Sequence, residues 1–148
     1  MKRLRLLPLL ALALAFTLAA CSSLQRTVTP GRDPAALREV FVATNLNDNH
    51  GLGRRLAAAF RARGLRAESG PLTLLPKSAE AVVSYQDRWA WDFGNHMVYL
   101  RLSLHDPGEL QPFATATRQR NIAKSTNLDE VIPAVVAELL APAPATNR

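Results

Sequence analysis

The sequence holds a single cysteine, Cys21, among its 148 residues. A lone cysteine excludes an intramolecular disulfide, so a core and not a covalent framework must stabilise the fold. Three roles remain for the thiol: a small buried apolar group, a nucleophile or a point of attachment. The position of Cys21, directly after the apolar and small residues Leu18-Ala19-Ala20, favours attachment.

No apolar run in the chain reaches the ~20 residues that span a bilayer. The longest, Leu6 to Leu18, has three positive charges before it at residues 2–5 and the small Ala19-Ala20 after it. A positive start, a short apolar run and small residues at the end form a secretory signal. An uncleaved membrane anchor is the alternative, and Gln25 and Arg26 follow too soon for a stop-transfer helix.

Leu18-Ala19-Ala20-Cys21 resembles the lipobox of bacterial lipoproteins. The resemblance implies that residues 1–20 are removed as a signal peptide and that Cys21 carries a diacylglyceryl thioether and an acylated amine. Several acyl chains anchor a protein stably, because each buried methylene contributes ~0.8 kcal/mol. In that family an aspartate after the cysteine commonly retains a protein in the inner membrane. Ser22 stands there instead, which implies sorting to the periplasmic face of the outer membrane.

The charge excess is small once the signal is set aside. Three of the 18 Lys and Arg lie in residues 1–20, which leaves 15 against 12 Asp and Glu, a net charge of +3 in place of +6. This charge and an exported location argue against a nucleic-acid partner. The 128 residues from Cys21 onward suffice for one domain with a real core.

Composition divides the mature chain into three parts. Ser, Thr, Gln, Pro and Gly dominate from Ser22 to about Pro34, which predicts that residues 21–36 are the lipidated cysteine and a flexible tether. Residues 37–141 are expected to form a periplasmic domain. Ala141-Pro142-Ala143-Pro144 ends the last helix, so residues 142–148 are expected to be a loose tail.

Hydrophobic periodicity predicts an α+β fold for this domain. Helical spacing covers Leu52–Arg63 and Leu128–Leu140. Strand patterns cover Arg38–Thr44, Leu65–Glu68, Ala81–Phe93, Met97–Leu104 and Phe113–Arg120. The order β-α-β-β-β-β-α places two helices on one face of a mainly antiparallel sheet. It is similar to that of small outer-membrane assembly lipoproteins such as the lipopolysaccharide-assembly lipoprotein, a resemblance of fold alone.

The candidate binding surface is Arg88, Tyr99, Arg101, Trp89 and Trp91. Both tryptophans share the parity of Tyr85 within Ala81–Phe93, whereas Arg88 has the opposite parity, and Tyr99 and Arg101 oppose the aliphatic residues of the next strand. The aromatic residues are either core under the helices or an exposed strip for a sugar, a peptide or a protein. Asp87 is the polar exception on the aromatic side, which suggests a bulge.

Motifs for catalysis or metal binding are few. His50, His96 and His105 have no metal-binding spacing, and the loop Asn45–Gly51 favours caps and turns over a calcium site. Asp87 and Asp92 have opposite parity, so they would not face one site. No serine lies in G-x-S-x-G. These patterns predict no enzyme, no metal and no cofactor beyond the covalent lipid on Cys21.

The sequence therefore predicts an outer-membrane-anchored periplasmic lipoprotein that binds or scaffolds an envelope protein or glycan. An assembly partner of an outer-membrane protein is the first alternative. An envelope hydrolase that uses Asp87 or Asp92 with a histidine is the second.

Overall fold

A computed structural model of the chain describes residues 22–91, 94–120 and 126–142. The predicted signal peptide, Cys21, Asp92, Phe93 and nearly all of the predicted tail lie outside the described residues. The strands are β1 (Ser22–Val28), β2 (Glu39–Ala43), β3 (Arg66–Gly70), β4 (Ala81–Trp91), β5 (Asn95–His105) and β6 (Pro112–Arg120), and the helices are α2 (Leu52–Ala62) and α3 (Leu128–Leu139). The 3-10 turn η1 (Pro34–Ala36) precedes β2, and the 3-10 turn η2 (Leu72–Leu74) follows β3. None of the helices in the described part is long and apolar enough to cross a membrane.

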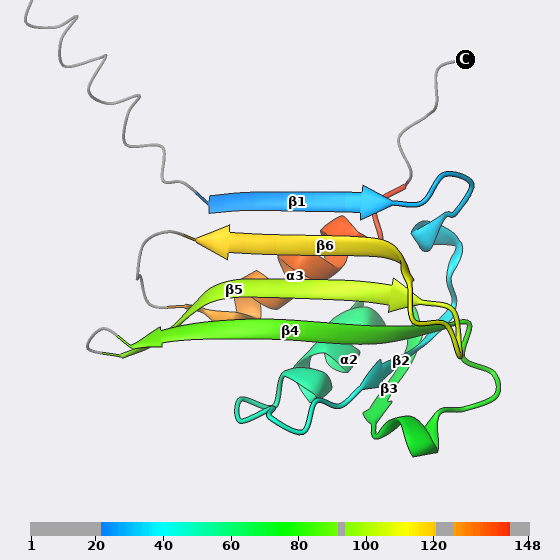
Figure 1. Cartoon of the computed structure of the whole chain (residues 1–148), viewed down its shortest axis with the longest axis horizontal. Helices are drawn as coiled ribbons and strands as arrows, with labels where there is room; N and C mark the ends of the chain where they lie inside the picture. Colours follow the sequence, from blue (N-terminus) through cyan, green and yellow to red (C-terminus); the bar gives the residue numbers. More distant parts are fainter. Residues whose placement is uncertain (1–21, 92–93, 121–125, 143–148) are drawn as a thin grey trace, which may run out of the picture.

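The strands form one sheet in the order β1-β6-β5-β4-β2-β3. β2 pairs in parallel with both β3 and β4, and the other pairings are antiparallel. Both helices lie on the same face of this sheet, and the opposite face is turned toward the viewer in Figure 1. The predicted α+β fold, with two helices on one face of a mainly antiparallel sheet, is confirmed.

The flexible tether predicted for residues 21–36 is wrong over its first half. Ser22–Val28 is strand β1, which pairs along its whole length with β6, from Ser22 opposite Arg120 to Val28 opposite Ala114. The guanidinium of Arg26 also donates to the carbonyls of Ala141 and Pro142 just after α3. The polar composition of this segment predicted a linker. An edge strand can form from such a sequence, because the neighbouring strand β6 provides the backbone hydrogen-bond partners that it needs.

The core lies between the sheet and the helices. Alternate residues of the central strands point to it, because the side-chain period of a strand is two. Twelve large side chains are almost completely buried there: Val40, Val42, Leu52, Leu56, Phe60, Val83, Leu100, Leu102, Leu104, Val135, Val136 and Leu139. Burial of each such side chain contributes roughly 1.5–3 kcal/mol, so this layer dominates the stability of the fold.

The β4–β5 hairpin contains the bulge that the sequence suggested, but on the other strand. Arg88 pairs with Tyr99, whereas Trp89 pairs with Met97, so Val98 is the extra residue. Val98 has the parity of Leu100, Leu102 and Leu104, so strict alternation along the sequence would place it on the covered face. Met97 takes that place and is buried. The alternation in β4 is uninterrupted, and Asp87 therefore stays on the helix side.

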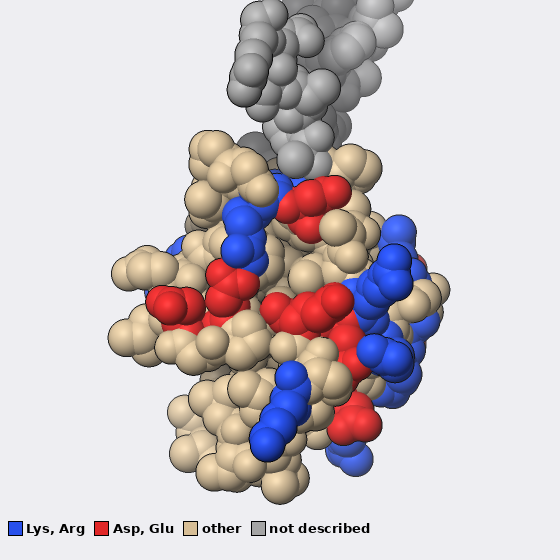
Figure 2. Space-filling view, turned by 90° about the vertical axis from the view of Figure 1, so that its right-hand side faces the viewer, with Lys and Arg blue, Asp and Glu red and all other residues tan. Residues whose placement is uncertain are grey.

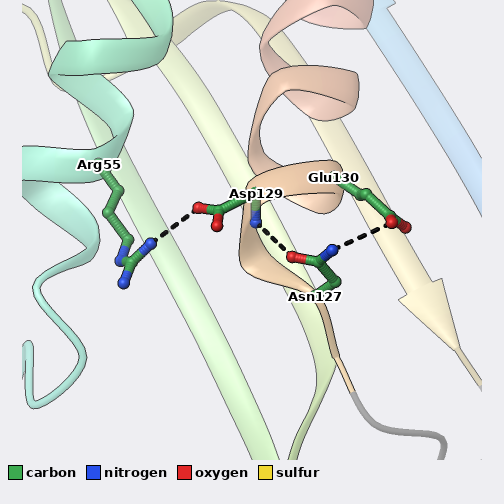
Figure 3. Close-up of polar contacts among 4 residues, drawn as sticks. All are labelled: Arg55, Asn127, Asp129 and Glu130. Carbon is green, nitrogen blue, oxygen red and sulfur yellow. Dashed lines mark hydrogen bonds and ion pairs between the residues drawn. The ribbon is translucent and has the colours of Figure 1, made fainter.

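A small polar cluster links the two helices (Figure 3). Asn127 caps α3, since its side-chain oxygen accepts the N–H of Asp129 at 3.0 Å. Its amide nitrogen donates to Glu130 at 3.0 Å, so Glu130 contacts the cap side chain and not the backbone N–H that a capping box requires. Asp129 forms an ion pair with Arg55 of α2, at 3.0 Å between Oδ1 and Nη1. Both partners are exposed, so this ion pair contributes little to stability.

Candidate functional site

The face of the sheet opposite the helices carries three consecutive rows of polar residues across four strands. Three cross-strand rows run from β1 through β6 and β5 to β4. They are Ser23-Gln119-Tyr99-Arg88, Gln25-Thr117-Arg101-Gln86 and Thr27-Thr115-Ser103-Ser84. We call these twelve residues the open face. Residues directly opposite across strands lie ~4.5–5.5 Å apart, so the rows form a continuous surface of hydroxyl, amide and guanidinium groups.

The open face carries two positive charges and no carboxylate. The guanidinium carbon of Arg88 lies 5.4 Å from the centroid of the Tyr99 ring, which is the range of a cation–π contact. Arg101 is half-buried in the middle row, and its Nε has no hydrogen-bond partner among the described residues. A flat surface of this chemistry can hydrogen-bond sugars and pair with anionic groups.

A groove of about 430 Å³ lies at one end of the open face, between η2 and the turn that joins β5 to β6. We call it the end groove. Val82, Leu72 and Leu110 give it an apolar lining, and Leu110 is 91% exposed. On the next strand of the sheet, β2, the same face is not open to solvent, because Phe41 is buried there.

Ser84 and His105 meet in the lining of the end groove, with 2.9 Å between Oγ and Nε2. A serine nucleophile needs such a base, but also a group that orients the histidine and donors for the oxyanion. Asp106, the carboxylate next in sequence, is engaged by Arg32. Among the contacts of the described residues, the Ser84–His105 hydrogen bond is the only part of such a catalytic arrangement that is present. The two side chains fit a role as polar lining of a binding groove.

The end of the molecule that holds the end groove is rich in carboxylates. Figure 2 looks onto this end, where acidic side chains gather over the middle, a group of basic ones lies on the right, and further basic ones lie above and below the acidic ones. Asp106 and Glu109 belong to the β5–β6 turn that lines the groove. Glu80 is close to the start of β2, because it accepts the backbone N–H groups of Arg38 and Glu39. This end thus carries carboxylates, which the open face lacks.

On the helix side, Asp48 organises the start of α2. Its carboxylate accepts the N–H groups of Leu52 and Gly53 at 2.8 Å each and the hydroxyl of Tyr85 at 2.9 Å. Burial alone would raise the pKa of Asp48, but these hydrogen bonds and one from His50 outweigh burial and lower it. Burial and the adjacent Asp48 raise the pKa of Tyr85 to about 12. The predicted capping role of the Asn45–Gly51 loop is confirmed.

The aromatic residues of β4 are divided between core and surface. Tyr85 is buried under α2. Trp89 is half-buried, stacks on His50 with 3.7 Å between ring centroids, and donates to Asp87 at 2.6 Å. Trp91 is 75% exposed at the end of β4. Of the two interpretations of these aromatic residues, the core role therefore holds for Tyr85 and the exposed position for Trp91.

Three of the predicted binding residues, Arg88, Tyr99 and Arg101, lie together on the open face. Trp89 and Trp91 are elsewhere, since Trp89 faces the helices and Trp91 lies at the tip of the hairpin. The sequence interpretation missed the β1 part of the face, because Ser22–Val28 had been assigned to a tether. The alternation of Leu24, Arg26 and Val28 with polar residues was the available signal.

No group of three or more His, Cys, Asp or Glu side chains that could hold a metal ion occurs within the described ranges. His50 is committed to Trp89 and His105 to Ser84. The absence of a metal site, predicted from the histidine spacing, stays a prediction for the whole chain.

Comparison with known proteins shows likeness of fold. Neither a protein-family model nor a curated protein matches the chain. A PelC dodecamer from Paraburkholderia phytofirmans is similar, with a TM-score of 0.57 and 20% identity over 81% of this chain and 98% of that one. A leucine-to-methionine variant of the PelC dodecamer from the same organism gives 0.56 and 18% identity over 80% and 95%. At this identity the likeness establishes the fold alone.

Proposed function

We propose that the protein is a non-enzymatic lipoprotein, anchored by Cys21 at the periplasmic face of the outer membrane, that binds an anionic envelope glycan on its open face. The observation that carries the binding role is the open face itself: twelve polar residues in register across four strands, with Arg88 and Arg101 as its only charges. The hydrophobic core lies on the opposite face of the sheet, and only Ser103 of the twelve is buried, so packing does not account for this composition.

The support for the anchor is the sequence Leu18-Ala19-Ala20-Cys21 and the signal that precedes it. Metabolic labelling with a fatty-acid analogue tests the anchor. We expect label on the wild type and none on Cys21→Ala, because the acyl acceptor is then absent. Label that persists on Cys21→Ala would contradict the lipoprotein proposal. Separation of the two membranes tests the sorting role of Ser22.

The glycan proposal is tested by gel electrophoresis of the soluble domain, residues 22–148, through gels that contain a polysaccharide. A uronic-acid polysaccharide should retard the domain, and neutral dextran should not. The retardation should fall as salt rises, since exposed charge pairs are screened within ~10 Å at 0.1 M ionic strength. Equal mobility in the two gels would refute binding of an anionic glycan by this face.

A second candidate function is assembly into a homo-oligomer that scaffolds an envelope component. The support is that both PelC structures of similar fold are dodecamers. Light scattering on the soluble domain measures its mass in solution, and a monomer at all concentrations would count against this candidate. A role as assembly partner of an outer-membrane protein stays a further proposal, to be tested by co-purification from the envelope.

A further inference from the structure

One end of the sheet carries an exposed tryptophan beside the start of the folded chain. β1 begins at Ser22, one residue after Cys21, so a trans peptide of about 3.8 Å between Cα atoms separates the lipidation site from the sheet. At the same end of the sheet, β4 finishes at Trp91 and β6 at Arg120, as Figure 1 shows on its left side. The domain is thus joined to its lipid without a spacer.

The register fixes how far each strand reaches in this direction. Ser23, Gln119, Tyr99 and Arg88 form one row across β1, β6, β5 and β4. Ser22 lies one residue beyond this row, whereas Trp91 lies three residues beyond it. At ~3.4 Å per residue, Trp91 therefore extends about 7 Å farther than Ser22, beyond the level of the lipidated residue. Three strand spacings of ~4.8 Å separate β4 from β1 laterally, about 14 Å.

The side chains at this end suit a bilayer surface. Tryptophan is enriched where hydrocarbon meets headgroups, because its ring is largely apolar and its N–H is polar. Trp91 is 75% exposed, and the strand below it is held by the contacts of Trp89 with His50 and Asp87. Arg120, opposite Ser22, adds a positive charge that anionic headgroups attract.

The opposite end of the sheet holds the end groove. Its β5–β6 turn carries Asp106 and Glu109 at the end groove, and carboxylates gather over the middle of that end (Figure 2). Anionic headgroups do not attract these carboxylates, and the reach of Trp91 is the observation that orients the domain.

We propose that Trp91 inserts into the headgroup region and that Arg120 contacts anionic headgroups, so that the end of β4 forms a second membrane contact beside the lipid on Cys21. This inference rests on the proposed lipid anchor. Two contacts about 14 Å apart limit tilting within the plane of the sheet, which favours strands along the membrane normal. The end groove then faces away from the bilayer, and the open face stands upright beside it.

Quenching of tryptophan fluorescence by brominated lipid tests this contact. The full lipidated protein is purified from the envelope and placed in phosphatidylglycerol-containing vesicles with bromine at a shallow acyl position. We expect the wild type to lose more fluorescence than Trp91→Phe, in which only Trp89 remains. The matched control is Trp91→Phe with Leu110→Trp, which moves the exposed indole to the opposite end and should show no added quenching. Arg120→Gln should reduce the gain in quenching that anionic lipid gives over zwitterionic lipid.

Equal quenching of the wild type and Trp91→Phe would overturn the inference, as would strong quenching of the indole at position 110. Mass spectrometry of the same samples separates the two levels of the argument. If Cys21 carries no lipid, the proposed anchor fails, and the inference fails with it. If lipid is present and Trp91 is not quenched, only the inference fails.

Discussion

The two faces of the sheet are built from the same strands but obey different constraints. On the covered face, Leu100, Leu102 and Leu104 of β5 are buried almost completely against α2 and α3. On the open face, the residues between and beside them are Tyr99, Arg101, Ser103 and His105. One strand thus changes from aliphatic to polar at every step.

The two faces differ in how far packing limits the choice of residue. A covered residue can be replaced only by one of similar size and polarity, because the interior is close-packed. Apart from the buried Ser103, an open-face residue has no such constraint, and most polar or charged residues would keep the sheet soluble. The uniform choice of neutral polar groups with two arginines is therefore the part of the sequence that function explains better than folding.

A charge on the covered side gives the largest expected effect. Val135→Asp or Leu139→Asp places a carboxylate where the side chain is fully buried in α3, so each should cost several kcal/mol and abolish the folding transition. Thermal melting by circular dichroism measures the loss. The control is Ala134→Asp on the exposed side of the same helix, which should change the free energy of unfolding by about 0.5 kcal/mol or less. Normal melting of both core variants would show that α3 does not pack on the sheet.

The buried hydroxyl of Tyr85 gives the next effect. It donates to Asp48 at 2.9 Å and accepts the N–H of Asn45 at 3.1 Å, so Tyr85→Phe leaves both partners without this hydrogen bond. We expect a loss of ~1–3 kcal/mol by urea unfolding. Tyr99→Phe, on the open face, is the matched control and should have a much smaller effect. Equal losses for the two tyrosines would contradict the distinction between the faces.

Acid should weaken the start of α2. The folded-state pKa of Asp48 is lowered from its usual 3.8, so its contribution to stability is present above about pH 5 and is lost as the pH falls through the lowered value. Asp48→Asn should flatten this decline when unfolding is measured from pH 7 to pH 2. Part of the decline should remain, because hydrogen bonds from Arg38 and Glu39 also lower the pKa of Glu80. An unchanged pH profile in Asp48→Asn would mean that its carboxylate is not the titrating group.

Periodicity predicted the long elements well and the short ones less well. α2 and α3 match their predicted ranges within one residue at each end, because their apolar positions repeat at helical spacing over three turns. β1 was missed because Ser22–Val28 gains its strand conformation from pairing with β6, which local composition does not encode.

The candidate site was predictable where it lies on long strands with a clear alternation of residues. Arg88, Tyr99 and Arg101 belong to long strands whose parity can be counted, so their common face followed from the sequence. Trp91 could not be placed by counting, since its parity is that of Tyr85 and Trp89. The hairpin extends past the helices, and position along the strand, not parity, decides its exposure.

Charge reversal on the open face should have the smallest effect on folding and a clear effect on binding. Arg88 is exposed, and Arg101 is half-buried with its Nε unpaired among the described residues, so Arg88→Glu with Arg101→Glu should shift the free energy of unfolding by about 1 kcal/mol at most. The same double variant should lose retardation by a uronic-acid polysaccharide and co-purify less with its envelope partner. Arg54→Glu with Arg63→Glu changes the net charge equally, at exposed positions on and just after α2, and should retain binding. A lost folding transition would make the open-face arginines structural, and equal binding by the two double variants would place the recognition surface elsewhere.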